Sequence, residues 1–429
     1  MLNLRLRDEF LGTHTPGTVI DLRAADNSGA TQRPATEILE ISYPTGDLQT
    51  GLRVLAADRP PRPVVLIGDK GRGKSHIMAV MHHAVASPDV VETWARDWGS
   101  KTGNKVLQGV TLLRGYQPIS EAVHNQEFPL LWDLLFARHP KGAEFKGRFL
   151  QSGDPYPARS LIEKMLEAQP IVLILDEFQN LSEIASDKPH LLVLVVSVLN
   201  NNTEAFEQVH RNDPVLINFQ GPTAKRDRQK LLLHRLFKNR DNIAEATVRD
   251  AVSAHAAERA RLLFGSLPPL ERQRRADEVA ECWPFSPELI ERLEGHILMS
   301  RAAQETRDLI RILAAVYRSR GEAVPLLTPA DFFVDDPTCG VQALLMSIAA
   351  AEQEDLLAVA HRNLDALQSQ GLNIPLSREV ITSLWMRSMS PDRAVGATRP
   401  EPHPDCTRDT PTDDNTFRDQ LQQIRDGCT

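Results

Sequence analysis

Residues 68–75 combine a glycine spacing with a lysine and a hydroxyl side chain in a pattern that suits phosphate chemistry. The segment reads Gly68-Asp69-Lys70-Gly71-Arg72-Gly73-Lys74-Ser75, with His76 next, and it fits GxxxxGK[ST]. An aliphatic run precedes it and a helical pattern follows it, which is the context of a phosphate-binding loop. Glycines let successive backbone N–H groups turn toward phosphate oxygens, and a helix that begins near Lys74 adds its positive dipole end. A glycine-rich turn with a chance lysine is the alternative.

This pattern predicts an ATP site that also holds Mg²⁺. Lys74 would reach the β- and γ-phosphates, and the hydroxyl of Ser75 would ligate the metal. Residues 68–76 as a whole are therefore the predicted nucleotide-binding segment.

Two carboxylates follow another aliphatic run further along the chain. Asp176 and Glu177 come directly after 171–175, at the carboxyl end of a predicted buried strand. Ligands bind at this end of the strands in open α/β sheets. We expect Asp176 to hold Mg²⁺ through a water molecule and Glu177 to polarise another water for in-line attack on the γ-phosphate. A buried strand that ends in a solvated acidic turn is the alternative interpretation.

A third polar residue at a strand end is Asn218. It follows the aliphatic residues 215–217, and there it could orient the attacking water beside Glu177. An ordinary asparagine in a turn before Gly221-Pro222 explains the same residue.

Strand and helix patterns alternate around these residues. We predict strands at 64–67, 171–175 and 215–219, with a weaker one at 110–113, and helices from near Pro44, from 74, at 191–199 and at 225–237. Short aliphatic strands separated by helices indicate a doubly wound, parallel α/β sheet. From 244 to 320 the sequence is rich in Ala, Glu, Arg and Leu and predicts an all-helical unit. Pro, Thr and Asp accumulate after residue 390, which predicts poor order, although Phe417, Leu421 and Ile424 have helical spacing.

These patterns predict five parts. They are an N-terminal lead-in (1–60), an α/β core with the loop (61–243), a helical lid (244–325), a C-terminal helical segment (326–390) and a poorly ordered tail (391–429), which is truncated if the chain is a piece of a longer protein.

Composition excludes several classes of protein. The 429 residues are 41% hydrophobic and 25% charged, as in ordinary globular proteins. A net charge of −8 argues against a protein that coats nucleic acid. The four cysteines form no CxxC pair, which excludes a zinc ribbon and favours a reducing compartment. The longest apolar run, 191–199, is shorter than the roughly 20 residues that span a bilayer. We therefore expect a cytoplasmic protein. The adjacent His82 and His83 cannot share one helix face, and we expect surface histidines there rather than metal ligands.

Together these motifs resemble those of the AAA+ ATPases. Within that class the chain is similar to large predicted ATPases of bacterial phage-defence loci, which include bacteriophage-exclusion and phage-growth-limitation ATPase subunits. The segments that carry the similarity are Ile41-Ser42-Tyr43-Pro44-Thr45, Gly73-Lys74-Ser75-His76, Leu175-Asp176-Glu177, Trp283-Pro284-Phe285-Ser286-Pro287-Glu288-Leu289-Ile290 and Thr306-Arg307-Asp308-Leu309-Ile310-Arg311-Ile312-Leu313-Ala314. The match spans roughly residues 36–330; the loop motif is generic and the two later segments are more specific.

The resemblance implies further roles. Arg307 would be the lid arginine that contacts the γ-phosphate, unless it is a solvated arginine of its helix. A neighbouring subunit would supply an arginine finger, with a solvated charged face as the alternative. The candidates are Lys225, Arg226, Arg228, Lys230, Arg235, Lys238 and Arg240. Relatives are longer, so the chain is expected to be a compact member or an amino-terminal piece of a longer protein.

Three functions follow from these observations. The first is a Mg²⁺-dependent ATPase that assembles as a homo-oligomer or with defence-system proteins and remodels a partner or a DNA-bound complex. The second is a nucleotide-dependent switch or scaffold with little turnover. The third is an initiator-type ATPase that loads on DNA directly, which the net charge disfavours.

Overall fold

The computed structural model describes most of the chain in two compact units. The described residues are 3–12, 20–24, 26–68, 71–122, 128, 130–176, 190–198, 213–219, 224–265, 267–294, 305–347, 351–389, 402–408 and 412–428. One unit comprises Val19–Leu231 and is called the α/β unit here; the other comprises Met1–Thr18 with Leu232–Thr429 and is called the helical unit. This division differs from the five predicted parts, because the first residues of the chain belong with its last two hundred or so.

The described part of the α/β unit contains one parallel sheet of five strands. They are β1 (Val64–Ile67), β2 (Gln117–Ala122), β3 (Ile171–Asp176), β4 (Leu192–Val198) and β5 (Val215–Asn218). Their order across the sheet is β2-β3-β4-β1-β5, and every neighbouring pair is parallel. The predicted α/β class with a parallel sheet is therefore confirmed. The strand that precedes the glycine loop, β1, and the acidic strand, β3, are not neighbours, because β4 lies between them.

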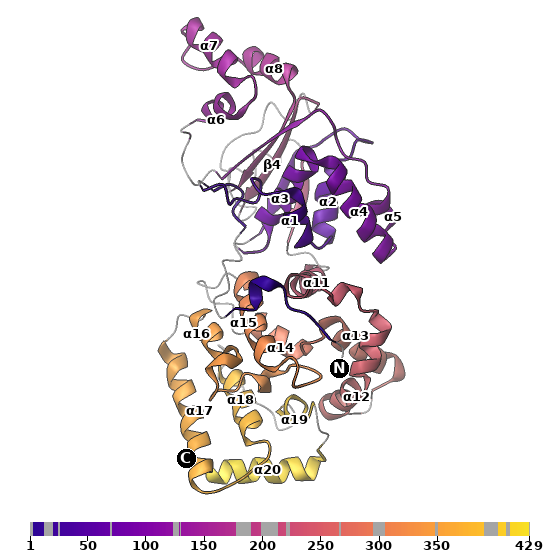
Figure 1. Cartoon of the computed structure of the whole chain (residues 1–429), viewed down its shortest axis with the longest axis vertical. Helices are drawn as coiled ribbons and strands as arrows, with labels where there is room; N and C mark the ends of the chain where they lie inside the picture. Colours follow the sequence, from indigo (N-terminus) through magenta and orange to yellow (C-terminus); the bar gives the residue numbers. More distant parts are fainter. Residues whose placement is uncertain are drawn as a thin grey trace. The chain divides into compact units, whose positions relative to one another are not determined.

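Helices cover both faces of this sheet (Figure 1). Alternate residues of each strand point to opposite faces, so Val64 and Leu66 of β1 belong to one hydrophobic cluster and Val65 to another. The first cluster includes residues of α1 (Ala35–Glu40), α2 (Gly46–Val54), α3 (Lys74–Ala86) and α4 (Pro88–Thr102), and the short α5 (Lys105–Gln108) packs on α4. The second includes residues of α6 (Leu131–Arg138), α7 (Gly142–Ser152) and α8 (Arg159–Ala168).

Two predictions about the strands are wrong. Residues 191–199 were predicted to be helical, but Leu192–Val198 form β4, all seven of whose residues are buried. A central strand of a sheet covered on both faces shows no polar alternation, so its sequence cannot be told from that of a buried helix. The predicted strand at 110–113 forms only an isolated bridge, between Leu112 and Ala56. A further strand that the sequence did not predict is β2, which forms the edge of the sheet next to β3.

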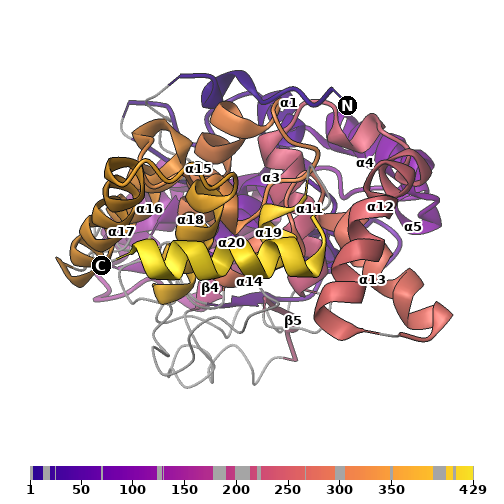
Figure 2. The same cartoon turned by 90° about the horizontal axis from the view of Figure 1, so that it is seen from below.

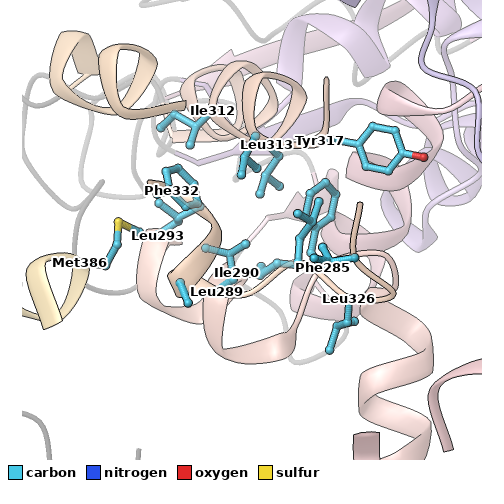
Figure 3. Close-up of a cluster of buried hydrophobic side chains, with 14 of the residues drawn as sticks. Phe285, Leu289, Ile290, Leu293, Ile312, Leu313, Tyr317, Leu326, Phe332 and Met386 are labelled. Carbon is cyan, nitrogen blue, oxygen red and sulfur yellow. The ribbon is translucent and has the colours of Figure 1, made fainter. Parts of the chain in front are cut away.

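The described part of the helical unit is built from helices and short turns. The longer helices are α12 (Glu245–Phe264), α13 (Pro269–Cys282), α15 (Glu305–Arg320), α17 (Ala351–Ser369), α18 (Ser377–Ser388) and α20 (Asp414–Gly427); the shorter ones are α14 (Pro287–Arg292), α16 (Gln342–Ser347) and α19 (Pro402–Cys406). Helix α11 (Ala224–Leu236) contributes residues to both units. Figure 3 shows part of the core, in which Phe285, Ile290, Leu313 and Phe332 lie together. The predicted helical character of 244–320 agrees with α12 to α15.

Residues 3–10 belong to this helical core. Leu4, Leu6 and Phe10 are buried in it. The Arg7 backbone N–H donates to Leu236 O at 2.9 Å, and the Tyr317 hydroxyl donates to Leu4 O at 3.2 Å. Within this segment the chain forms a 3-10 turn at Asp8–Phe10 and an isolated bridge between Leu6 and Phe237.

The described residues of the predicted poorly ordered tail include two helices, α19 and α20, which pack on the helical unit. Every residue of 402–408 is buried. Helix α20 lies beside α17 and α18 (Figure 2) and buries Phe417 and Ile424. High Pro, Thr and Asp content misled the prediction, because these residues cap and break helices as well as occurring in disordered segments: Asp413 caps α20 by accepting from the N–H groups of Asn415 and Thr416. In the described part of the chain, no helix combines the length and the apolar character that crossing a membrane requires.

Candidate functional site

The glycine-rich loop joins β1 to α3 at the carboxyl end of the sheet. Gly71 and Gly73 have φ angles of 80° and 96°, in the region that side-chain-bearing residues avoid. Gly73 is the N-cap residue of α3, so the helix begins at Lys74, as predicted. The first-turn N–H groups of a helix have no partner within it and form an anion site at its N-terminus. Asp69 and Lys70 lie outside the described residues.

Lys74 spans the loop from its C-terminal end. Its side chain is buried, and Nζ donates to the Gly68 carbonyl oxygen at 2.5 Å. A lysine ammonium has three protons to donate, so this contact leaves donor capacity on the same group. This contact places the positive charge of Lys74 beside the carbonyl oxygen of Gly68, the first residue of the loop.

Ser75 and Asp176 meet although 101 positions separate them in the sequence. Ser75, in the first turn of α3, donates from Oγ to Asp176 Oδ2 at 2.6 Å. Asp176 is the last residue of β3 and is buried. The sequence predicted that both residues ligate Mg²⁺, and the structure places their oxygens side by side.

Ser197 completes this arrangement. It lies on β4, between β3 and β1, and its hydroxyl donates to the other oxygen of the carboxylate, Asp176 Oδ1. Sequence reasoning missed it, because 191–199 was assigned to a helix. The signal was present in the sequence: Ser197 is the single polar residue in an otherwise aliphatic strand, Leu192–Val198.

His76 connects the loop helix to the segment before the sheet. Its Nε2 lies 2.7 Å from Ser42 Oγ, and the Ser42 hydroxyl donates to Ile38 O, also at 2.7 Å. Because a serine has only one hydroxyl proton, His76 Nε2–H donates in the first of these contacts. The lead-in around 41–45 is therefore held against the start of α3.

Asn218 does not join Asp176. It ends β5 in register with Ile67 of β1, and both β1 and β4 lie between β5 and β3. Three inter-strand spacings of about 4.8 Å put roughly 14 Å between the two strands. The predicted role beside Glu177 is thus not supported by the strand order. Glu177 itself lies outside the described residues.

Three of the arginines with predicted roles are Arg307, Arg240 and Arg235. Arg307 lies in α15, but its side chain is outside the described part of the structure. Arg240 is buried and donates to Trp283 O and Ala280 O. Arg235 is buried beside Glu9. Arg235 and Arg240 thus stabilise the helical unit, and neither is on a solvated face or free to act as a finger.

The prediction that His82 and His83 are surface residues is wrong for His83, and His82 is only partly exposed. His83 is buried and its Nε2 lies 2.8 Å from Ala30 O, while His82 Nδ1 lies 2.8 Å from Ser120 Oγ. Burial lowers the pKa of both imidazoles, that of His82 to about 3. They are uncharged in the folded chain at neutral pH.

The donor set at the loop suits a small hard cation. Serine and aspartate oxygens are the ligands that Mg²⁺ prefers, and this ion is usually held by one or two protein oxygens with water and phosphate. No cluster of three or more His, Cys, Asp or Glu residues that could hold a metal occurs among the described residues. Ser75 and Asp176 are therefore the residues that could hold such a cation, together with water or phosphate oxygens.

The chain was also compared with known proteins. No family model matches it, and no curated protein matches it.

Proposed function

We propose that this chain binds ATP with Mg²⁺ at the loop 68–76 and hydrolyses it, as an ATPase of the AAA+ type. The observation that carries the proposal is the contact between Ser75 and Asp176, at 2.6 Å. A glycine loop alone occurs by chance, but this loop ends beside a buried carboxylate from a strand that is not its neighbour. The glycine loop and the acidic strand are separate patterns in the sequence, and Ser75 of the first contacts Asp176 of the second.

Each residue has a chemical task in this proposal. Lys74 and the N–H groups at the start of α3 neutralise phosphate oxygens. Ser75 and Asp176 hold the metal, which supplies charge neutralisation on the β- and γ-phosphates. Glu177, which follows Asp176 directly, accepts a proton from the attacking water.

The wider role rests on resemblance. An AAA+ ATPase acts in an oligomer and couples ATP hydrolysis to movement of a helical lid. In this proposal the helical unit contains that lid. We propose that the partner is a second copy or another protein of a phage-defence system. All four cysteines are free thiols, which favours the reducing cytoplasm as the place of action.

Binding and turnover of ATP test the proposal. Lys74→Ala should abolish ATP binding, whereas Lys105→Ala, a change at an exposed lysine of α5, should leave it intact. Asp176→Asn should reduce Mg²⁺-dependent turnover more than binding. Circular dichroism of each variant establishes that it is folded. Full ATP affinity in folded Lys74→Ala would overturn the assignment of the loop.

Glu177→Gln separates hydrolysis from switching. A large loss of turnover with binding retained supports the ATPase. Equal turnover in wild type and variant would instead favour a nucleotide-dependent switch, in which ATP occupancy alone sets assembly. The mass in solution with and without ATP then shows whether occupancy controls oligomerisation.

A further inference from the structure

The carboxylate of Asp176 is held at both of its oxygens by hydroxyl groups from two different elements. Ser75 of α3 donates to Oδ2, and Ser197 of β4 donates to Oδ1. The first donor is itself a metal ligand in the proposed function. The second lies within the sheet, where its relative exposure is 0%.

The register of the sheet explains how Ser197 reaches Asp176. On β4, Val193 and Val195 belong to the cluster on the α3 side, and Ser197 follows them with the same two-residue period. On β3, Val172 and Ile174 belong to that cluster, and Asp176 follows in the same way. Both side chains therefore project to the face that α3 covers.

Packing alone does not account for a serine at this position. The other six residues of β4 are Leu or Val, and a buried hydroxyl costs free energy unless it has a hydrogen-bond partner. The partner here is a carboxylate, and hydrogen bonds to charged groups are stronger than those between neutral groups. A serine at position 197 thus makes fewer apolar contacts than Val or Leu would, but it holds the carboxylate of Asp176 by a hydrogen bond.

We propose that Ser197 is a positioning residue, which fixes the Asp176 carboxylate so that Oδ2 faces the Mg²⁺ site. This inference rests on the proposed function. A serine hydroxyl has one proton and two lone pairs, so Ser75 Oγ can offer a lone pair to a metal and still donate its proton to Oδ2. Ser197 holds Oδ1 from the sheet whether or not a metal is bound, so the Asp176 carboxylate is oriented before the metal binds.

Ser120 provides a matched control. It is a buried serine of the same sheet, on β2, which is the other neighbour of β3. Its hydroxyl lies 2.8 Å from His82 Nδ1, and its strand pairs with β3, but the side-chain hydrogen bonds of Asp176 go to Ser75 and Ser197 instead. Ser120→Ala and Ser197→Ala therefore remove the same atom from equally buried places, and only the second removes a partner of Asp176.

The experiment measures ATP affinity of the full chain by titration calorimetry, once in excess EDTA and once in millimolar Mg²⁺. Ser197→Ala should weaken ATP binding about tenfold in Mg²⁺ and leave binding in EDTA unchanged, since a hydrogen bond to a charged group contributes on this order. Ser120→Ala should change neither affinity. Ser197→Thr retains the hydroxyl and should restore most of the Mg²⁺-dependent gain. Thermal denaturation reports the loss of stability in each variant.

The outcomes distinguish this inference from the function on which it rests. Equal Mg²⁺ dependence in Ser197→Ala and Ser120→Ala, with ATP still bound, overturns the role of Ser197 and leaves the nucleotide site intact. Absence of ATP binding by the wild type in Mg²⁺ overturns both. If Ser197→Ala does not fold, Ser197→Cys, which keeps the size but donates poorly, should show the same tenfold loss, and wild-type Mg²⁺ dependence in that variant overturns the inference.

Discussion

Arg408 donates from Nη2 to Asp331 Oδ1 at 2.5 Å, and the two side chains are only 3% and 0% exposed. The pair joins the buried segment 402–408 to a turn that lies 77 positions earlier. Asp331 Oδ2 also accepts from the N–H of Thr328, and the Thr328 hydroxyl donates to Asp405 O. A polar network thus connects the C-terminal segment to the interior of the helical unit.

Removing one partner of this ion pair should be costly. Arg408→Ala leaves Asp331 buried with Arg320, 3.5 Å away, as its remaining cation, and we expect a loss of about 3 kcal/mol in the free energy of unfolding. Urea denaturation followed by circular dichroism measures it. The control is Arg425→Ala, whose pair with Asp426 is exposed; it should change stability by less than about 0.5 kcal/mol. Equal effects of the two substitutions would contradict the importance of the buried pair.

The stacking of Phe417 on His403 provides a second test of this region. The rings lie 4.1 Å apart between centroids and are inclined by 4°, and Phe417 is buried. Phe417→Ala should lower the free energy of unfolding by about 3–5 kcal/mol, through lost burial and the cavity left behind. Leu384→Ala, at an exposed position of α18, is the comparison and should cost far less. A truly disordered tail would give no difference between the two.

Gly73 and Gly147 form a matched pair of glycines. A Cβ added at either meets no atom within 4 Å, but only Gly73 has a positive φ, of 96°. Gly73→Ala should therefore destabilise the folded chain by about 1–2 kcal/mol through backbone strain and weaken ATP binding. Gly147→Ala, within α7, should stabilise it by about 0.5–1 kcal/mol through helix propensity. Thermal denaturation reveals the opposite signs, and the same sign for both would refute the strained loop.

The lowered pKa of His82 should make the free energy of unfolding depend on pH. Burial, and then the charges of His83 and Arg23, lower its pKa from 6.5 to about 3. Below about pH 6.5 the imidazole is protonated in the unfolded chain but not in the folded chain. Protonation therefore stabilises the unfolded chain, and the free energy of unfolding decreases as the pH falls from 6.5 toward 3. Between pH 7.5 and 5 the loss is about 2 kcal/mol. His82→Asn should remove it.

The measurement for His82 is a difference of differences. Urea unfolding of wild type and His82→Asn at pH 7.5 and pH 5 isolates this imidazole from other titrating groups, His83 included. The gap in stability between the two chains should narrow by about 2 kcal/mol at the lower pH. An unchanged gap would mean that His82 titrates normally in the folded chain.

The sequence revealed the loop and the acidic strand because each combines a local pattern with a local cause. Val64–Ile67 and Ile171–Asp176 are short aliphatic runs bounded by polar turns, and Gly73 is needed where the helix begins. The strand order was beyond such reasoning, because it depends on contacts between distant segments. That order is what separates Asn218 from Asp176 and brings Ser197 beside it.

Two other segments were hidden by their composition. Strand β2 contains Pro118, Ser120 and Glu121, which are poor strand signals. Its buried polar side chains have partners from other elements: Arg138 Nε pairs with Glu121 at 3.0 Å, and His82 lies against Ser120. Residues 402–408 were likewise assigned to a poorly ordered tail from their Pro, Thr and Asp content, and the partners that bury their charges, Asp331 and Arg387, lie far away in the sequence.

The helical unit encloses residues from the very start of the described chain, and this has a consequence for synthesis. Tyr317, whose hydroxyl donates to the carbonyl oxygen of Leu4 in the folded unit, is synthesised 313 residues later. At about 5–20 residues per second, roughly 15–60 s pass between the two on the ribosome. During that time the apolar side chains of Leu4, Leu6 and Phe10 lack most of the helices that bury them, although all residues of the α/β unit have been synthesised. The nascent chain must therefore keep its first segment apart from a folded neighbour until the helices that bury it have emerged.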